Sequence, residues 1–428
     1  MRVVKTDKEF KGFFKLLRRR AAGTDNQVLE NTSKIVQAVR AKGDRALSSY
    51  TKRLDGHSKI RIGQRELEEA AAMADKTLVK ALRTAAGRIR RFHEKQVHGK
   101  KTWFMEEAGI KTGQIVRPLE RVGVYVPGGK ASYPSSVLMN VIPAQAAGVR
   151  EIAVAVPTPS GNLNPAVMAA LKLLGITEAY SIGGAQAVAA FAFGTETVKK
   201  VDKIVGPGNI YVATAKRLVF GEVAIDMIAG PSEILIIADS SADPSFAAAD
   251  LLSQAEHDEL ASSILVTDSP DFANETMRML KGQLNALARG NIASLSLKNY
   301  GAVIIVRNLD HAAEVANQIA PEHLELMVRR PEKFVKKIRN AGAVFVGPWS
   351  AEPLGDYAAG PNHVLPTGGT ARFSSPLGAY DFMKHMSYLE FTRSGLERLS
   401  GTVETMASFE GLTAHLNTVM IRRKKGLV

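Results

Sequence analysis

Several histidines of this sequence stand beside acidic or amide side chains. In Gln254-Ala-Glu-His257 an amide and an imidazole are three residues apart, directly after an apolar run, 246–252, that is typical of a helix. Side chains at this spacing share one helical face, so both could contact the same ion. The alternative interpretation is a solvated helix end, because the pair alone has little specificity.

A second string, Pro321-Glu322-His323, places a carboxylate next to an imidazole. Pro321 favours a turn or the first position of a helix. The two titratable side chains could each act as a general base. A charged helix start without any catalytic role would have the same appearance.

Two further histidines follow acidic residues near the end of the chain. Asp356 and His363 lie in a segment rich in turn residues after the predicted strand 343–346, and such loops often carry functional side chains. Glu410 and His415 lie in a segment predicted to be helical. The sequence has no cysteine, so a zinc site would need His, Asp, Glu or amide ligands. Gln254, His257, Asp356 and His415 form a sensible zinc set, although their spacing does not show that they converge.

Short apolar runs alternate with helical stretches from about residue 119 onward. These runs predict strands at 122–126, 152–156, 179–182, 203–205, 234–238, 263–267, 302–306 and 343–346. Strands that alternate with helices indicate parallel sheets covered on both faces, so we expect an α/β fold with two open sheets. Residues 26–100 are predicted to be helical, and the segment after about 375 is predicted to be helical again, without a strand.

Three glycine-rich turns follow predicted strands in one half of the chain, at 127–129, 183–186 and 206–209. Turns in this position favour a ligand crevice at the carboxyl ends of a parallel sheet. The usual dinucleotide fingerprint is missing, because Tyr211 stands where Gly206-Pro-Gly208 would require its third glycine.

Composition excludes several classes of protein. No apolar run is long enough to span a membrane, and no secretory signal is visible at the N-terminus, so we expect a cytoplasmic protein. The net charge of +14 suggests nucleic acid, but the basic residues do not form one block and few aromatic residues interleave with them. We therefore interpret the charge as solvated surface with a mild attraction for anionic ligands.

Taken in order, these strings resemble the histidinol dehydrogenase family over nearly the whole chain. The matching stretches include 121–130, 183–187, 201–209, 229–233, 253–257, 320–325, 355–357, 362–367 and 410–415. The resemblance implies a zinc- and NAD-dependent oxidation of L-histidinol through the aldehyde to L-histidine, the last step of histidine biosynthesis. It also implies two Rossmann-like domains without the usual fingerprint, and small terminal segments that are exchanged in a homodimer.

The resemblance assigns roles to individual residues. It implies that zinc is bound by Gln254, His257, Asp356 and His415, and that NAD contacts Tyr125, Gln186 and Asn209. It further implies that Glu322 and His323 carry the acid–base chemistry. The substrate would contact the zinc ligands, this catalytic pair, and also Ser232, His363 and Glu410.

The expected domains are an N-terminal segment, 1–16; a first Rossmann-like domain, 17–118 with 236–374; a second, 119–235; and a helical dimerisation segment, 375–428. Two other functions are compatible with parts of the sequence. One is a related zinc- and NAD-dependent dehydrogenase of another small polyol, which would need a different set of substrate-holding residues. The other is a basic nucleic-acid-binding protein, which would show steeply salt-dependent DNA binding and no reduction of NAD.

Overall fold

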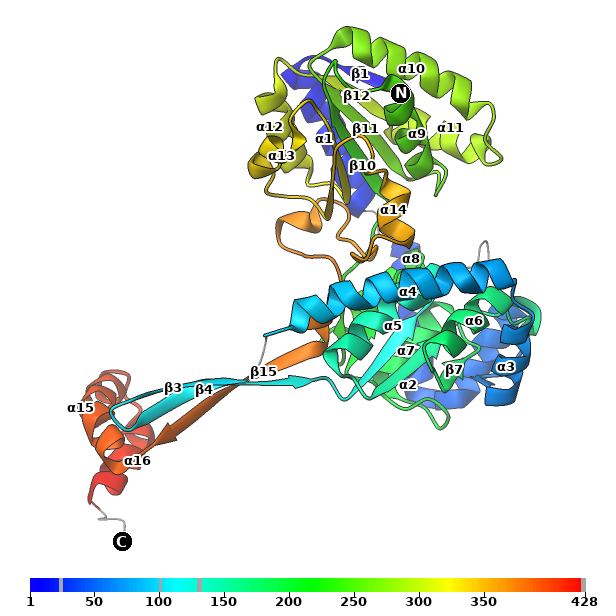
Figure 1. Cartoon of the computed structure of the whole chain (residues 1–428). Coiled ribbons are helices and arrows are strands. Elements are labelled where there is room, and N and C mark those ends of the chain that lie inside the picture. The colour runs from blue at the N-terminus through cyan, green and yellow to red at the C-terminus, as the bar shows by residue number, and fades with distance from the viewer. Residues whose placement is uncertain (23–25, 100–101, 129–132, 425–428) are drawn as a thin grey trace.

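The computed structural model describes residues 1–22, 26–99, 102–128 and 133–424. Within these residues the chain forms two α/β lobes and a long arm that projects from one of them (Figure 1). The fold is therefore the predicted α/β class with Rossmann-like parallel sheets. None of the helices formed by the described residues is long and apolar enough to cross a membrane.

Lobe A is built on a parallel sheet whose strand order is β1-β12-β11-β10-β13-β14. Its strands are β1 (Arg2–Val4), β10 (Glu233–Ala238), β11 (Ser262–Thr267), β12 (Ala302–Ile305), β13 (His323–Met327) and β14 (Ala343–Val346). Its helices are α1 (Asp7–Ala22), α9 (Pro244–Ala255), α10 (Pro270–Leu284), α11 (Gly290–Tyr300), α12 (Leu309–Ile319), α13 (Pro331–Phe334) and α14 (Glu352–Tyr357). Apolar clusters cover both faces of this sheet, as its continuous Val- and Ile-rich strands require.

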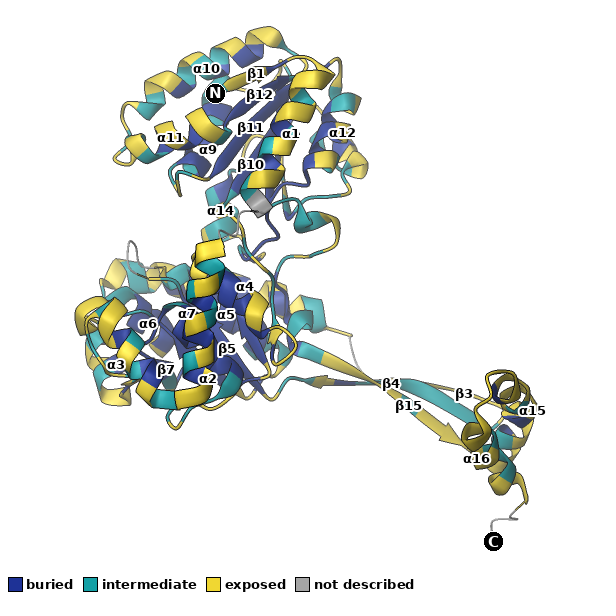
Figure 2. Ribbon diagram, turned by 180° about the vertical axis from the view of Figure 1, so that it is seen from behind, coloured by how far each residue is buried: buried dark blue, intermediate teal, exposed yellow. Residues whose placement is uncertain are grey.

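Lobe B contains a sheet of order β2-β7-β6-β5-β8-β9, in which only the short β2 runs antiparallel among the described pairings. Its strands are β2 (Arg61–Ile62), β5 (Arg121–Tyr125), β6 (Glu151–Ala155), β7 (Glu178–Tyr180), β8 (Lys203–Val205) and β9 (Ala224–Ile225). Its helices are α2 (Asn26–Asp55), α3 (Gln64–Ala72), α4 (Lys76–Val97), α5 (Pro134–Ala147), α6 (Pro165–Leu173), α7 (Gly184–Phe193) and α8 (Ile210–Val219). In Figure 2 the two sheets are the most buried parts of the molecule.

The packing of the early helices differs from the domain division that the sequence suggested. Helix α2 packs on α7 and α8, while α3 and α4 pack on α6 and α5, so residues 26–97 belong to lobe B rather than to the lobe of 236–374. Residues 1–16 are not a separate segment either. Strand β1 pairs with β12, and Phe13 of α1 lies in the core of lobe A.

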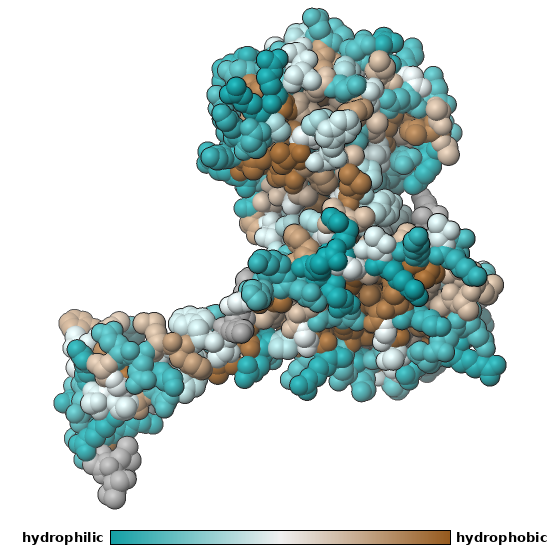
Figure 3. All heavy atoms as spheres, viewed as in Figure 1, coloured by the Kyte–Doolittle hydropathy of each residue, from teal (hydrophilic) through white to brown (hydrophobic). Residues whose placement is uncertain are grey.

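The arm consists of β3 (Trp103–Glu107), β4 (Ile110–Pro118), β15 (Met383–Phe391), α15 (Arg393–Phe409) and α16 (Thr413–Lys424). Strand β15 pairs antiparallel with β4 over its whole length, which corrects the expectation that the segment after 375 has no strand. Its residues are mostly exposed, so there is no apolar run to reveal it. Figure 3 shows apolar side chains along the arm, where Trp103 is 52% exposed and Phe409 is 91% exposed.

Candidate active site at the amino edge of lobe A

Glu322 and His323 lie at the amino end of β13, which runs between β10 and the edge strand β14 in the sheet of lobe A, and both are buried. This corrects the expectation of a turn or helix start at Pro321. Helix α12 ends at Ala320, which adopts a left-handed conformation, and the chain then enters the sheet directly. The strand was missed because its sequence, His323-Leu-Glu325-Leu-Met327, carries a buried glutamate where an apolar run is expected.

The backbone of Glu233, the first residue of β10, holds both members of the pair. Its amide donates to Glu322 Oε2 at 2.8 Å, and its carbonyl oxygen is 3.0 Å from His323 Nδ1. Because a carbonyl only accepts, Nδ1 carries a hydrogen, and neutral His323 presents its lone pair at Nε2. This Nε2 has no hydrogen-bond partner among the described residues, and it lies 3.5 Å from Asp356 Oδ1.

Helix α14 brings two carboxylates to the same point. Glu352 and Asp356 are four residues apart on one helical face, and single atoms of His323, Glu352 and Asp356 lie within 4.8 Å of one another. The backbone amide of Glu352 donates to buried Glu325 at 3.0 Å, and Ser253 donates to the Glu352 carboxylate at 3.2 Å. Glu352 was not among the predicted site residues, although its spacing of four residues from Asp356 could have indicated it.

Burial and mutual charge shift the pKa values of this cluster in opposite directions. Burial raises the pKa of Glu322 to about 7 despite the charge of His323. Burial alone would lower the pKa of His323, but Glu322 and Asp356 raise it to about 10. Burial would raise the pKa of Asp356, yet the nearby imidazole of His323 lowers it to about 2. The cluster therefore carries excess negative charge that favours a bound cation.

Gln254 lies in the last turn of α9, and His257 follows the end of this helix. The side chain of Gln254 is 1% exposed, and neither its Oε1 nor its Nε2 finds a partner within the described part of the chain. The Nδ1 of His257 is 2.9 Å from the carbonyl oxygen of Ser253, so its Nε2 is available to a ligand. Because Ser253 also contacts Glu352, this end of α9 adjoins α14.

His363 approaches the same cluster from the loop after α14. Its Nδ1 is 3.1 Å from the carbonyl oxygen of Asp356, and burial lowers its pKa while the charge of Asp356 opposes that shift. It is also close enough to His323 and His257 to interact electrostatically with both. Ser232 directly precedes Glu233, whose backbone contacts Glu322 and His323. The structure thus gathers Ser232, Gln254, His257, Glu322, His323, Asp356 and His363 at one edge of lobe A.

The three residues expected to contact NAD lie at the carboxyl edge of lobe B. Tyr125 is the last residue of β5, and its hydroxyl accepts from the Gly184 amide at 3.2 Å, while burial raises its pKa to about 12. Gln186 is 1% exposed, and its Oε1 is unpartnered among the described residues. Asn209 caps α8 by accepting from the amides of Tyr211 and Val212. Gly129 of the first glycine-rich turn lies outside the described residues.

A buried ion pair fixes the turn that carries Asn209. Lys216 and Asp226 form this pair, with side chains 2% and 1% exposed. Asp226 accepts from the Gly206 amide at 2.8 Å, and Lys216 donates to the Gly206 carbonyl at 3.0 Å. Gly206 has a φ of 118°, and an added Cβ would lie 2.0 Å from the Tyr125 carbonyl oxygen, so the turn requires glycine.

Comparisons with known proteins agree over nearly the full length of the chain. The family model described as histidinol dehydrogenase matches residues 18–423. A histidinol dehydrogenase of Syntrophotalea carbinolica is 54% identical over 93% of each chain, and one of Geobacter metallireducens is 52% identical over 98% of this chain and 97% of that protein. A crystal structure of histidinol dehydrogenase from Elizabethkingia anophelis superposes with a TM-score of 0.93 at 38% identity, covering 99% of this chain and 98% of that one.

The chain belongs to the histidinol dehydrogenase family. Two of the residues to which resemblance to this family gave site roles are not near the cluster in the isolated chain. Glu410 ends α15 and His415 lies in α16, and both are exposed on the arm. Figures 1 and 2 agree that these helices lie at the far end of the β4–β15 ribbon, away from α14.

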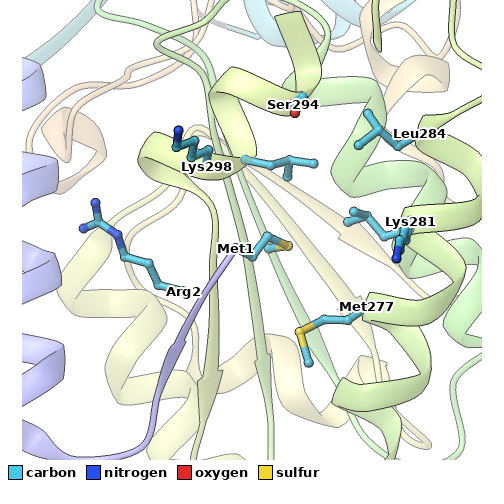
Figure 4. A pocket seen from close by; sticks show the side chains of 9 residues that line it. Met1, Arg2, Met277, Lys281, Leu284, Ser294 and Lys298 are labelled. Carbon is cyan, nitrogen blue, oxygen red and sulfur yellow. The ribbon is translucent and has the colours of Figure 1, made fainter. Parts of the chain in front are cut away.

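The cavity drawn in Figure 4 is separate from the cluster that the histidinol dehydrogenase family resemblance indicates. It has a volume of about 410 Å³ and lies between β1, α10 and α11, with Met1, Met277 and Leu284 among its lining residues. None of the expected site residues lines it. The chemistry is instead concentrated where the sheet of lobe A presents its amino ends.

Proposed function

We propose that the chain oxidises L-histidinol to L-histidine in two steps, with two NAD⁺ as hydride acceptors and one zinc ion per site. The observation that carries the proposal is the buried Glu322–His323 pair. The His323 Nε2 has no hydrogen-bond partner among the described residues and lies near the carboxylates of Glu352 and Asp356, which are suited to a metal. Membership of the histidinol dehydrogenase family supports the choice of substrate. We expect the protein to work in the cytoplasm, since it has no cysteine to protect from oxidation or to pair.

The residues of lobe A fit a zinc ion. Gln254 buries an amide whose oxygen and nitrogen both lack partners among the described residues, a costly arrangement unless a ligand satisfies it. His257 has a free Nε2, and Asp356 is held ionised by its surroundings. With His415 of a second chain these residues would provide two imidazoles, a carboxylate and an amide oxygen. Zinc would orient the substrate through its imidazole and amino groups and offset the negative charge of the cluster.

The pair Glu322–His323 can perform the proton transfers. His323 Nε2 would take the proton of the substrate hydroxyl as the carbon loses hydride, which gives the aldehyde. Glu322 would take a proton from the water that adds to this aldehyde, while His323 would return its proton to the aldehyde oxygen, which gives the hydrate and restores neutral His323. His323 would then remove the hydroxyl proton of the hydrate during the second loss of hydride, which gives the carboxylate. NAD⁺ accepts each hydride, and we assign its binding to Tyr125, Gln186 and Asn209 of lobe B.

His323 must be neutral to act as a base, whereas its carboxylate neighbours raise its pKa to about 10. Binding of a divalent cation by Asp356 would cancel much of that carboxylate's pull on His323 and lower the pKa toward the working range. The metal would therefore be needed for the protonation state of the base as well as for substrate binding.

The position of Glu410 and His415 implies a homodimer with shared sites. Both residues are exposed on an arm that carries exposed apolar side chains and extends away from its own lobe A. We infer that the arm crosses to a second copy and places these two residues in the site of that copy. Co-expression of Glu322→Gln and His415→Asn, two variants expected to form almost no L-histidine alone, tests this directly when L-histidine formation is measured. About a quarter of wild-type activity should return if the chains pair at random, because one site of each mixed dimer is intact.

The function itself is tested by counting products. Purified protein with L-histidinol and excess NAD⁺ should release two NADH for each L-histidine formed, and exhaustive chelation should abolish this reversibly. No NADH from L-histidinol would overturn the proposal. Full activity in protein shown to be free of metal would refute the role of zinc but not the assignment of L-histidinol as the substrate. Mixed dimers that stay inactive would refute only the inference that each active site is shared between two chains.

A further inference from the structure

Arg20, in the last turn of α1, sends a buried side chain to the amino edge of lobe A. This side chain is 1% exposed and forms an ion pair with the carboxylate of Glu233. The guanidinium also donates to the carbonyl oxygen of Leu260 at 2.7 Å and, through a longer contact of 3.4 Å, to that of Ser232. It stacks near the Tyr300 ring, 5.6 Å from the ring centre.

These acceptors belong to the entry segments of two neighbouring strands. Ser232 and Glu233 lead into β10, while Leu260 leads into β11, and the Ser262 amide donates to the Ser232 carbonyl at 3.0 Å. A planar guanidinium with donors in a fixed fork can join a carboxylate and two carbonyl oxygens at once, whereas a lysine would offer one point charge. Arg20 therefore fastens the start of β10 to the start of β11.

The peptide groups fastened in this way are those that hold the catalytic pair. The Glu233 amide donates to Glu322, and the Glu233 carbonyl fixes the ring of His323. The register of β10 and β13 aligns Ile234 with His323, so Glu233 lies one step beyond the last paired position. On its other side Glu233 is paired with Ser262 of β11, so a ladder holds it from one neighbouring strand only. Arg20 adds a restraint through the Glu233 carboxylate and the carbonyl oxygens of Ser232 and Leu260.

We propose that Arg20 is a positioning residue for the oxidation, acting through Glu233 on the carboxylate of Glu322 and the imidazole of His323. This inference rests on the proposed function of that pair. It gives the N-terminal helix a part in the reaction, although none of its residues was expected in the site. A displacement of about 1 Å at reacting groups can cost about 100-fold in rate, so a loosened Glu233 should reduce kcat in both half-reactions.

The test compares Arg20→Gln with Arg19→Gln, since Arg19 is the exposed neighbour on the same helix turn. Because Arg20→Gln leaves a buried carboxylate without its cation, a third variant, Arg20→Gln/Glu233→Gln, removes both charges and protects the fold. Each variant is assayed for kcat and KM with the alcohol and with the aldehyde, for bound zinc, and for the midpoint of thermal unfolding.

We expect the double variant to stay folded with bound zinc and an unchanged KM for NAD⁺, while kcat falls about 10- to 100-fold with both substrates. Arg20→Lys should recover part of this loss, and Arg19→Gln should match the wild type within about twofold. Wild-type kcat in the folded double variant would overturn the positioning role. So would equal losses in Arg19→Gln. Wild-type protein that makes no NADH from L-histidinol would instead overturn the proposed function. In that case the positioning role is still tested by a crystal structure of the double variant, which shows whether Glu322 and His323 have moved.

Discussion

The two sheets present opposite edges to their expected ligands. Lobe B offers the carboxyl ends of its strands, where Tyr125, Gln186 and the Gly206 turn supply neutral groups and main-chain atoms. Lobe A offers its amino ends, where Glu322, His323 and Asp356 are packed into contact. Recognition of the dinucleotide and proton transfer are thus assigned to separate lobes, which makes them separable by mutation.

Helix geometry accounts for the difference in charge. At the carboxyl edge of a parallel sheet the following helices begin, and their N-termini favour anions such as phosphate groups. At the amino edge helices end, and their C-termini favour cations. Helix α9 ends at Ala255, directly beside Gln254 and His257, so its dipole would add to the carboxylates in attracting the proposed metal.

The largest effect should follow from removing the base. His323→Asn should lower the rate of both half-reactions by about 10²- to 10⁴-fold, since the loss of a general base typically costs that much. NAD affinity, measured by fluorescence titration, should stay within about twofold because lobe B is untouched. His98→Asn, an exposed histidine at the end of α4, is the matched control and should be silent. A large loss of NAD affinity in His323→Asn would contradict the assignment of NAD binding and proton transfer to separate lobes.

The converse change is made in lobe B. Lys216→Met leaves Asp226 buried without its partner, which should cost about 3–5 kcal/mol of unfolding free energy in urea denaturation. The Gly206 turn should loosen as well, so NAD binding should weaken while bound zinc stays constant. Lys200→Met removes an exposed pair with Glu222 and should cost at most about 1 kcal/mol. If Lys216→Met lost its bound zinc but kept its NAD binding, the assignment of NAD binding to lobe B and zinc binding to lobe A would be contradicted.

Within lobe A the two members of the catalytic pair should differ. Glu322→Gln should reduce aldehyde oxidation about 100-fold more than alcohol oxidation, because only the aldehyde requires an activated water. The two substrates are assayed separately, with single turnovers if product release limits either rate. Equal losses with both would show that Glu322 does not activate the water.

The smallest predicted effect is a pH dependence of the unfolding free energy, and it arises from contacts at the junction of the two lobes. Asn362, next to His363, donates to the carbonyl oxygen of Met139 in α5 and contacts His93 Nε2 in α4. Burial lowers the pKa of His93 from 6.5 to about 4. As the pH falls below 6.5 the unfolded chain binds a proton that the folded chain refuses, so stability falls with decreasing pH.

Between pH 6.5 and 5 this linkage should remove about 2 kcal/mol of unfolding free energy. Denaturant titrations of wild type and His93→Gln across that range measure it, and the variant should have the shallower slope. Parallel slopes for the two proteins would exclude His93 as the source.

Much of the fold could be predicted because apolar runs in buried parallel strands are conspicuous. All eight predicted strands exist, within one or two residues at their ends. Strand β13 was missed because Glu325 interrupts its apolar pattern, and that glutamate is tolerated since it accepts from the Glu352 amide. Strand β15 was missed because it lies on the exposed arm. The attachment of α2, α3 and α4 to lobe B could not be seen, because an amphipathic helix does not indicate which sheet covers it.

The candidate site was predicted mainly by family resemblance rather than by spacing. Spacing indicated the Gln254–His257 face but not its proximity to α14, which depends on how two distant segments pack. Arg20 was not predicted because it is buried by tertiary contacts that no local pattern encodes. Glu352 was not predicted either, although its spacing of four residues from Asp356 is a local pattern. The resemblance, and not any local pattern, implied that the segment carrying Glu410 and His415 serves a second chain, and in the structure both residues lie on the arm.

The order of strands along the chain has a consequence for biosynthesis. The sheet of lobe B is formed by residues between 61 and 225, so it can assemble as soon as that stretch has left the ribosome. Lobe A must wait, because β1 at residues 2–4 finds its neighbour only when β12 at 302–305 has been made. The β4–β15 ribbon waits still longer, until residue 391 emerges. The nascent chain can thus form the edge expected to bind the dinucleotide first, the edge proposed to be catalytic second, and the arm last.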